Sequence, residues 1–115
     1  WGVYPIDNEF FMSKNAFAGQ ICIGTIFGIN DNTLRFSSEF RVKEDYELCL
    51  RTMCGGGLVV RYNWLAPVAG HKTKGGCSDD WKANDYNKYA DWLIALYPEY
   101  VMKGNKKGEI KMKKR

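Results

Sequence analysis

Residues 84–98, NDYNKYADWLIALYP, constrain the fold more than any other part of this sequence. Apolar side chains recur three and four residues apart in this segment, which places them on one face of a helix: Tyr86, Tyr89, Ala90, Leu93, Ile94 and Tyr97. Proline cannot continue a helix, so Pro98 marks its end. The segment therefore predicts an amphipathic helix.

A second helix is predicted over residues 44–54. Its apolar side chains also form one stripe, made of Tyr46, Cys49, Leu50 and Met53, and Gly55 is a typical residue just beyond a helix end. Arg51 near the carboxyl end complements the helix dipole.

Strands are predicted over 20–29 (QICIGTIFGI) and 57–62 (GLVVRY), because both runs are rich in β-branched and aromatic residues. Residues 15–19 indicate a weak break before the first strand, and NDN at 30–32 indicates a turn after it. GEIKMKK at 108–114 suggests an exposed edge strand after a glycine-flanked turn. This order of elements predicts an α/β fold with a mixed sheet and two principal helices.

The charge of the chain is concentrated at its end. The formal net charge is +4, but residues 103–115 hold seven basic side chains and one acid, which leaves 10 bases and 12 acids elsewhere. We therefore separate a body, residues 1–102, from a basic tail or edge strand, residues 103–115. The tail is either a solubilising segment or a contact for nucleic-acid phosphates.

Glu44 and Asp45 allow two interpretations. Carboxylates are favoured in the first turn of a helix by its free amides and dipole, which explains the pair without any function. The same position keeps the pKa of a carboxylate low, so that it is ionised and able to act as a general base toward a hydroxyl.

The long connection over residues 63–85 is a second candidate for function, because connections of this length within a compact domain are uncommon. Lysines, glycine amides and a hydroxyl suit a phosphate, and the substrate-binding candidates here are Lys72, Lys74, Gly75, Gly76 and Ser78. His71 is the candidate metal ligand, and Trp81 is the aromatic residue that we most expect to be exposed for stacking. A surface loop without function is the alternative.

Two global features indicate the cellular setting. The start, WGVYPIDNEFF, lacks the pattern of a secretory signal, and no apolar run is long enough for a membrane span. None of the four cysteines shows the CxxC spacing of a zinc site. We expect a cytoplasmic protein without membrane contact, with reduced and mostly buried thiols.

Several segments together, in order and spacing, resemble a known family. They are WGVYPIDNEFFM, the glycine-containing strand, KEDYELCLR, GGGLVVRYNWLAP, KGGCS, ADWLIALYPEYV and GEIKMKKR. Nearly the whole chain resembles the C-terminal half of the TET-associated glycosyltransferases of phages and large viruses, which have a GT-A-like nucleotide-sugar transferase fold.

The resemblance implies a partial GT-A-like domain with residues 1–102 as its acceptor-side portion. Asp45 would be the base for the acceptor hydroxyl and Glu44 would assist it, while the lysine and glycine segment would close over the donor diphosphate. The implied reaction moves a sugar from a nucleotide-diphosphate donor to a hydroxyl, on a modified base of DNA, with Mn or Mg as cofactor. His71 matches a metal-binding histidine of GT-A enzymes.

One departure from the family concerns the donor side. GT-A enzymes bind the nucleotide and metal through an N-terminal half with a D-x-D motif, and Asp7-Asn8-Glu9 is a poor substitute for it. We expect that half to lie outside this chain. The alternatives are a non-catalytic nucleic-acid-binding or interaction module and an inactive fragment that forms a homodimer.

Overall fold

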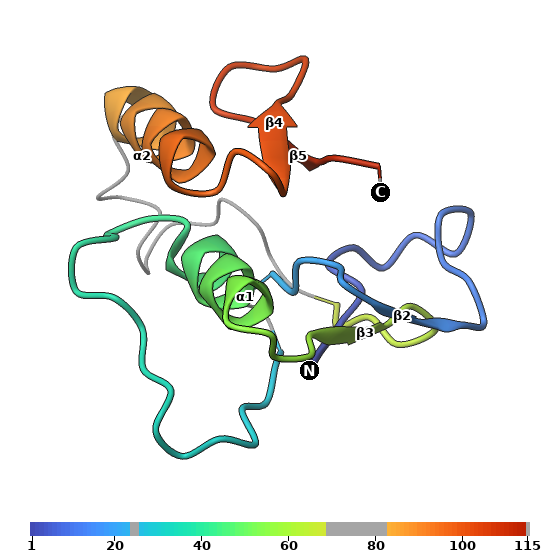
Figure 1. The fold of residues 1–115 in the computed structure, drawn as a ribbon. Coiled ribbons are helices and arrows are strands. Elements are labelled where there is room, and N and C mark those ends of the chain that lie inside the picture. Colours follow the sequence, from blue (N-terminus) through green and yellow to red (C-terminus); the bar gives the residue numbers. More distant parts are fainter. Residues whose placement is uncertain (24–25, 69–82, 115) are drawn as a thin grey trace.

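The computed structural model describes residues 1–23, 26–68 and 83–114, and Figure 1 shows their arrangement. In chain order the elements are β1 (Gly2–Val3), β2 (Ala16–Ala18), α1 (Glu44–Cys54), β3 (Val60–Tyr62), α2 (Ala83–Leu96), β4 (Val101–Lys103) and β5 (Ile110–Met112). The protein is thus a small α/β domain with a mixed sheet and two helices, which confirms the predicted class at this level.

The larger sheet has the strand order β1-β3-β2. Strand β1 runs parallel to β3, with Gly2 opposite Arg61, whereas β2 runs antiparallel to it, with Phe17 opposite Arg61. Strand β3 therefore lies at the centre of a mixed sheet. A single bridge between Gly2 and Phe27 attaches the segment between β2 and α1 to β1.

Both predicted helices are present. In α1 the side chains of Cys49 and Leu50 are buried, and Tyr46 and Met53 pack against the core, as the apolar stripe predicts. Lys43 precedes the helix in a left-handed conformation, with φ 61° and ψ 24°. Helix α2 ends at Leu96, two residues before the proline that predicts its end.

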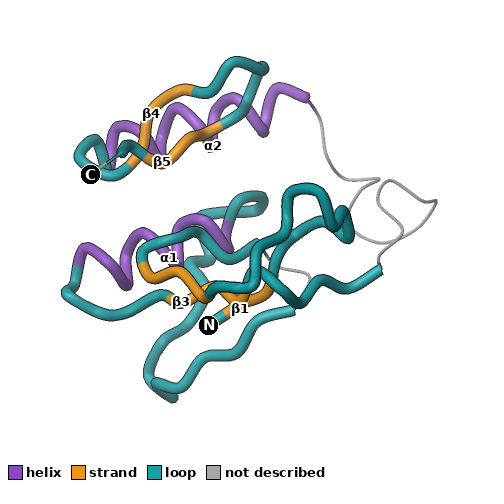
Figure 2. Tube along the Cα trace, turned by 90° about the vertical axis from the view of Figure 1, so that its right-hand side faces the viewer, coloured by secondary structure: helices purple, strands orange, loops and turns teal. Residues whose placement is uncertain are grey.

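Strands β4 and β5 form an antiparallel hairpin that lies beside α2 in both views (Figures 1 and 2). Val101 pairs with Met112, and Lys103 pairs with Ile110. Val101 and Ile110 are buried, so one face of the hairpin joins the core.

One hydrophobic core joins the two layers of the fold. It contains Cys49 and Leu50 from α1, Leu93 from α2 and Val101 from β4. Figure 2 shows α2 and the hairpin as one layer and α1 with the larger sheet as the other. No helix in the described parts of the chain has the length and apolar character needed to cross a membrane.

The strand prediction for residues 20–29 is wrong for the residues that the structure describes, 20–23 and 26–29. Ile21 and Cys22 are buried, but side chains satisfy their backbone groups in place of a neighbouring strand. Arg61 donates to the carbonyl of Ile21 at 3.3 Å, and the amide of Cys22 donates to Sγ of Cys49 at 3.4 Å. At residues 21 and 22 the apolar pattern reflects burial, and not sheet pairing.

The predicted break at residues 15–19 is also wrong, because β2 lies within it. All three residues of β2 are exposed, as is common for an edge strand, so the sequence carries no apolar signal for it. The strand predicted over 57–62 is present only as Val60–Tyr62.

Candidate functional site

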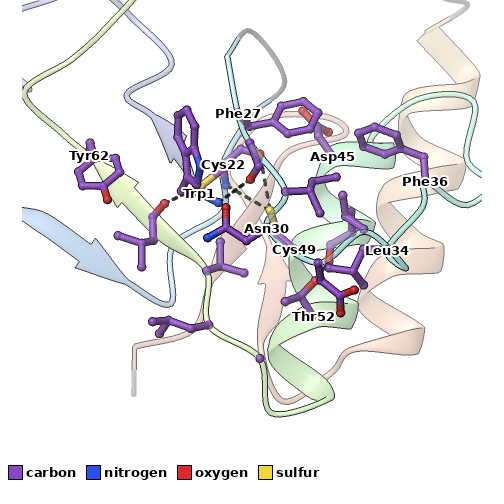
Figure 3. Close-up of a pocket in the computed structure, with 18 residues that line it drawn as sticks. Trp1, Cys22, Phe27, Asn30, Leu34, Phe36, Asp45, Cys49, Thr52 and Tyr62 are labelled. Carbon is purple, nitrogen blue, oxygen red and sulfur yellow. Dashed lines mark hydrogen bonds between the residues drawn. The ribbon is translucent and has the colours of Figure 1, made fainter.

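A cavity of about 390 Å³ lies between α1, the start of β3 and the loop that follows residue 26 (Figure 3). Its wall is mainly apolar, with a few polar side chains among the apolar ones. A concave apolar site of this size with few polar groups is the usual form of a small-molecule site. Its lining residues are Trp1, Cys22, Phe27, Gly28, Ile29, Asn30, Asp31, Leu34, Phe36, Asp45, Leu48, Cys49, Thr52, Gly57, Leu58, Val59, Val60 and Tyr62.

Asp45 belongs to the first turn of α1 and lines this cavity. It is half-buried, and its Oδ1 accepts a hydrogen bond of 2.8 Å from the amide of Tyr46. The carboxylate thus lies in the wall of a cavity and not on an open convex surface. This is the placement that a role in chemistry requires.

Glu44 precedes Asp45 in the same turn but does not line the cavity. Burial raises the pKa of Glu44 above its ordinary value, and the neighbouring Asp45 charge adds to the effect. The expectation that the helix start keeps this pKa low is therefore wrong for Glu44, because desolvation raises the pKa by more than the hydrogen bond with its own backbone lowers it.

The charge of Asp45 acts on the pKa values of one cation and two phenol groups, Lys43, Tyr46 and Tyr86. The ammonium of Lys43 lies 4.7 Å from the ring centre of Tyr46 and 5.0 Å from that of Tyr86. Burial lowers the pKa of Lys43, while Asp45 acts in the opposite direction. Burial, together with Asp45, raises the pKa of Tyr46 to about 12. At neutral pH both phenols are protonated.

Aromatic rings form part of the cavity wall. Phe27 and Phe36 meet edge to face at 5.5 Å, and the rings of Trp1 and Tyr62 meet at 6.3 Å. In Figure 3 these two pairs lie on opposite sides of the cavity. Such surfaces suit a flat ring as ligand.

Glycine is required where Trp1 meets the loop. Trp1 and Gly28 exchange two backbone hydrogen bonds of 2.8 Å each. A methyl group at position 28 would overlap the indole ring of Trp1. The indole can therefore lie against the loop only because residue 28 has no side chain.

Two thiols lie side by side in the cavity wall. The Cys49 thiol donates to the carbonyl of Cys22 at 3.7 Å, and the Cys22 thiol donates to the carbonyl of Val60 at 3.5 Å. The contact with Cys49 lowers the pKa of Cys22, whereas the same contact and burial raise the pKa of Cys49. Both are free thiols and buried, as predicted, but Cys54 is exposed.

Asp31 is the other carboxylate that lines the cavity. Its Oδ1 accepts hydrogen bonds from the amide of Thr33 at 2.8 Å and from its hydroxyl at 2.6 Å, which lower the pKa of Asp31. The turn predicted at residues 30–32 explains this geometry. Asp31 thus stabilises the turn of the loop through Thr33, and it is a second carboxylate of the cavity with which Asp45 can be compared.

Sequence reasoning missed one buried carboxylate, Glu47. Its side chain is only 6% exposed, and Oε1 lies 2.9 Å from Nε of Arg51 and 3.2 Å from the hydroxyl of Tyr97. Arg51 therefore pairs with a buried carboxylate, in addition to complementing the helix dipole. The spacing of four residues between Glu47 and Arg51 was the available signal.

The remaining predicted site residues lie outside the described parts of the chain: Lys72, Lys74, Gly75, Gly76, Ser78, Trp81 and the candidate metal ligand His71. Within the described parts, no three or more His, Cys, Asp or Glu side chains come together as a metal site.

Comparison of the sequence with known protein families and with curated proteins, and of the fold with solved structures, gives no match. The function proposed below therefore rests on the geometry of the cavity and on the family resemblance of the sequence.

Proposed function

We propose that this chain is the acceptor-side part of a GT-A-like glycosyltransferase, which moves a sugar from a nucleotide-diphosphate donor to a hydroxyl of a modified DNA base. One observation supports the proposal above all others: Asp45, at the amino end of α1, lines a cavity that has aromatic walls. A convex, solvated position for Asp45 would have removed its basis.

The cavity suits the acceptor part of this reaction. Its volume of about 390 Å³ is in the range of sites for small ring compounds. A pyrimidine could lie against the aromatic rings with its hydroxymethyl group directed toward Asp45. The thiols and aliphatic side chains of the wall would keep bulk water from that hydroxyl.

The chemical step requires one base from this chain. Asp45 takes the proton of the acceptor hydroxyl while the hydroxyl oxygen forms a bond to the anomeric carbon of the donor. The bond between that carbon and the diphosphate oxygen breaks, and the diphosphate leaves with the electron pair. Ground-state placement of the hydroxyl beside the carboxylate supplies much of the effect.

The donor side rests on the family resemblance. The lysine and glycine segment, 72–78, would stabilise the diphosphate, and Mn or Mg would bind through His71 and residues beyond those described. The residues that the structure describes form no metal site, and the role proposed for them is to bind the acceptor and accept its proton.

Acceptor binding can be tested by amide NMR. The chain is titrated with hydroxymethyldeoxycytidine and, separately, with deoxycytidine. The proposal expects shifts at cavity residues such as Leu48 and Thr52, and tighter binding of the hydroxymethylated nucleoside. Shifts that fall outside the cavity would contradict the assignment of the acceptor site.

Transfer is tested with the chain joined to the nucleotide-binding half that the proposal places outside it. This longer protein is incubated with a hydroxymethylated oligonucleotide, uridine diphosphate sugars and Mn, followed by mass spectrometry of the oligonucleotide. Asp45→Asn should lower the rate by about 100-fold or more, because a general base contributes about that much. Asp31→Asn is the matched control, since Asp31 also lines the cavity but belongs to the loop after residue 26 and not to the first turn of α1. Equal rates for the two variants, or no transfer to any acceptor, would refute the proposal.

A further inference from the structure

The β4–β5 hairpin carries a lysine face that the acceptor site does not use. Residues 103–114 contain six lysines and one acid, and all six lysines are exposed. We define the lysine face as the five of them that have no ion pair within the described parts of the chain: Lys106, Lys107, Lys111, Lys113 and Lys114.

The backbone that carries these lysines is anchored to the core. Its inner face is in the core, where Val101 is 1% exposed, and its outer face presents Lys111 opposite Met102. The amide of Lys113 donates to the carbonyl of Tyr100 at 2.8 Å, which continues the ladder beyond β5. The backbone through Lys113 is therefore part of the folded domain.

The loop of the hairpin is also fixed. The carboxylate of Glu109 accepts a hydrogen bond of 2.9 Å from the amide of Lys106. Gly108 has a φ of 72° and packs closely against Tyr86 and Asn87 of α2, where a side chain would be both strained and crowded. Lys106 and Lys107 thus lie on a turn that is attached to the helix.

Internal acids neutralise little of this charge. Lys103 lies 3.7 Å from Asp91 of α2, and Glu109 is bound to the loop backbone. The backbone contact and the charges of Lys106 and Lys111 lower the pKa of Glu109, so those two lysines share its surroundings. In residues 1–102 acids outnumber bases by 12 to 10, so the positive charge is concentrated in the last segment of the chain.

We propose that the lysine face binds the phosphate backbone of duplex DNA. Lys111 and Lys113 are two residues apart on one extended strand, so their side chains share a face and are separated by about 6.7 Å. This is close to the distance between successive phosphates along a DNA strand. Successive lysines can therefore meet successive phosphates.

The face suits a duplex better than a single strand. Sites for single strands combine basic side chains with exposed aromatic rings on which bases stack. Tyr100 is the aromatic residue in this part of the hairpin, and it is half-buried with its hydroxyl directed to the carbonyl of Met53 at 3.4 Å. The lysine face thus contacts phosphates without reading bases.

A groove continues the face toward the larger sheet. Lys113 and Lys114 line it together with Gly19 and Gln20, next to β2. The choice of DNA over other polyanions rests on the proposed function, since an acceptor hydroxyl on a DNA base must be brought to the cavity by contacts with the rest of the duplex.

Binding is measured by fluorescence anisotropy of a labelled, unmodified duplex from 50 to 200 mM salt. Unmodified DNA has no acceptor hydroxyl, so the result does not depend on the chemistry at Asp45, and Asp45→Asn should bind equally well. With about four phosphate contacts, the slope of log affinity against log salt should be about −3.6. A slope near zero would overturn the proposal.

The double variant Lys111→Gln with Lys113→Gln should bring the slope about 1.8 closer to zero and weaken binding at least about tenfold at 100 mM salt. Lys14→Gln with Lys88→Gln is the control, because it removes the same charge from exposed sites outside the hairpin. Far-ultraviolet circular dichroism verifies that each variant is folded. Equal weakening by both pairs, or equal affinity for single-stranded DNA, would overturn the proposal.

Discussion

Removal of the guanidinium of Arg51 should destabilise the fold more than its exposure suggests. The side chain of Arg51 is 41% exposed, but that of its partner Glu47 is only 6% exposed. Arg51 provides Glu47 with hydrogen bonds of 2.9 Å and 3.3 Å, and Tyr97 adds one of 3.2 Å. Arg51→Met keeps the aliphatic stem and leaves Glu47 buried with Tyr97 alone.

The magnitude follows from the cost of an unpaired buried charge. Removing one partner of a fully buried pair costs about 3–5 kcal/mol, whereas exposed pairs are worth less than about 1 kcal/mol. Since Arg51 is partly solvated and Tyr97 remains, we expect a loss of about 2 kcal/mol in the free energy of unfolding. For a domain of this size that corresponds to a fall in Tm of about 8 °C.

Urea denaturation followed by circular dichroism gives this free energy, with an unchanged m-value as the sign that the denatured state is not altered. A second variant isolates the cause. Adding Glu47→Met to Arg51→Met removes the buried charge. The free energy of unfolding of the double variant should therefore exceed that of Arg51→Met by about 1 kcal/mol or more. A double variant less stable than Arg51→Met, or a loss below about 0.5 kcal/mol for Arg51→Met itself, would refute the reasoning.

Two further predictions concern the cavity and its surroundings. Gly28→Ala should destabilise the domain by about 1–3 kcal/mol in urea and shift the indole NMR signal of Trp1, whereas Gly55→Ala, where a methyl group has room, should leave that signal in place; equal effects would contradict the close contact. Tyr46 and Tyr97 have a pKa raised from 10 to about 12, because both are partly buried near carboxylates. The contribution of these two phenols to the free energy of unfolding should be fully present below pH 10 and be lost as pH rises toward 12, because the unfolded phenols ionise first. An ultraviolet titration in which all seven tyrosines ionise near pH 10 would contradict this.

The two helices could be predicted because their signals are local. The apolar stripe from Tyr46 to Met53 and the proline after α2 define each helix within one segment. The carboxylate at residue 45 could also be selected from its place in the first turn. Its chemical value, however, depends on whether a cavity lies beside it, which no local pattern reports.

The strands could not be placed as well, because pairing joins distant segments. Residues 21 and 22 are as apolar as a core strand, yet Arg61 and Cys49 satisfy their backbone. Residues 16–18 are exposed and lack a strand pattern, yet they pair with β3. β-Propensity records burial and packing, so it identifies neither the partner nor the register.

The sequence alone determined the two helices, the general α/β class and the basic end of the chain, since each depends on neighbouring residues. Tertiary structure alone decided that Trp1, Phe27 and Asp45, from three separate segments, line one cavity, and that the basic end is folded as a hairpin against α2. The reason is physical: helix periodicity acts over a few residues, whereas a cavity and a sheet exist only after segments far apart in the chain have been brought together.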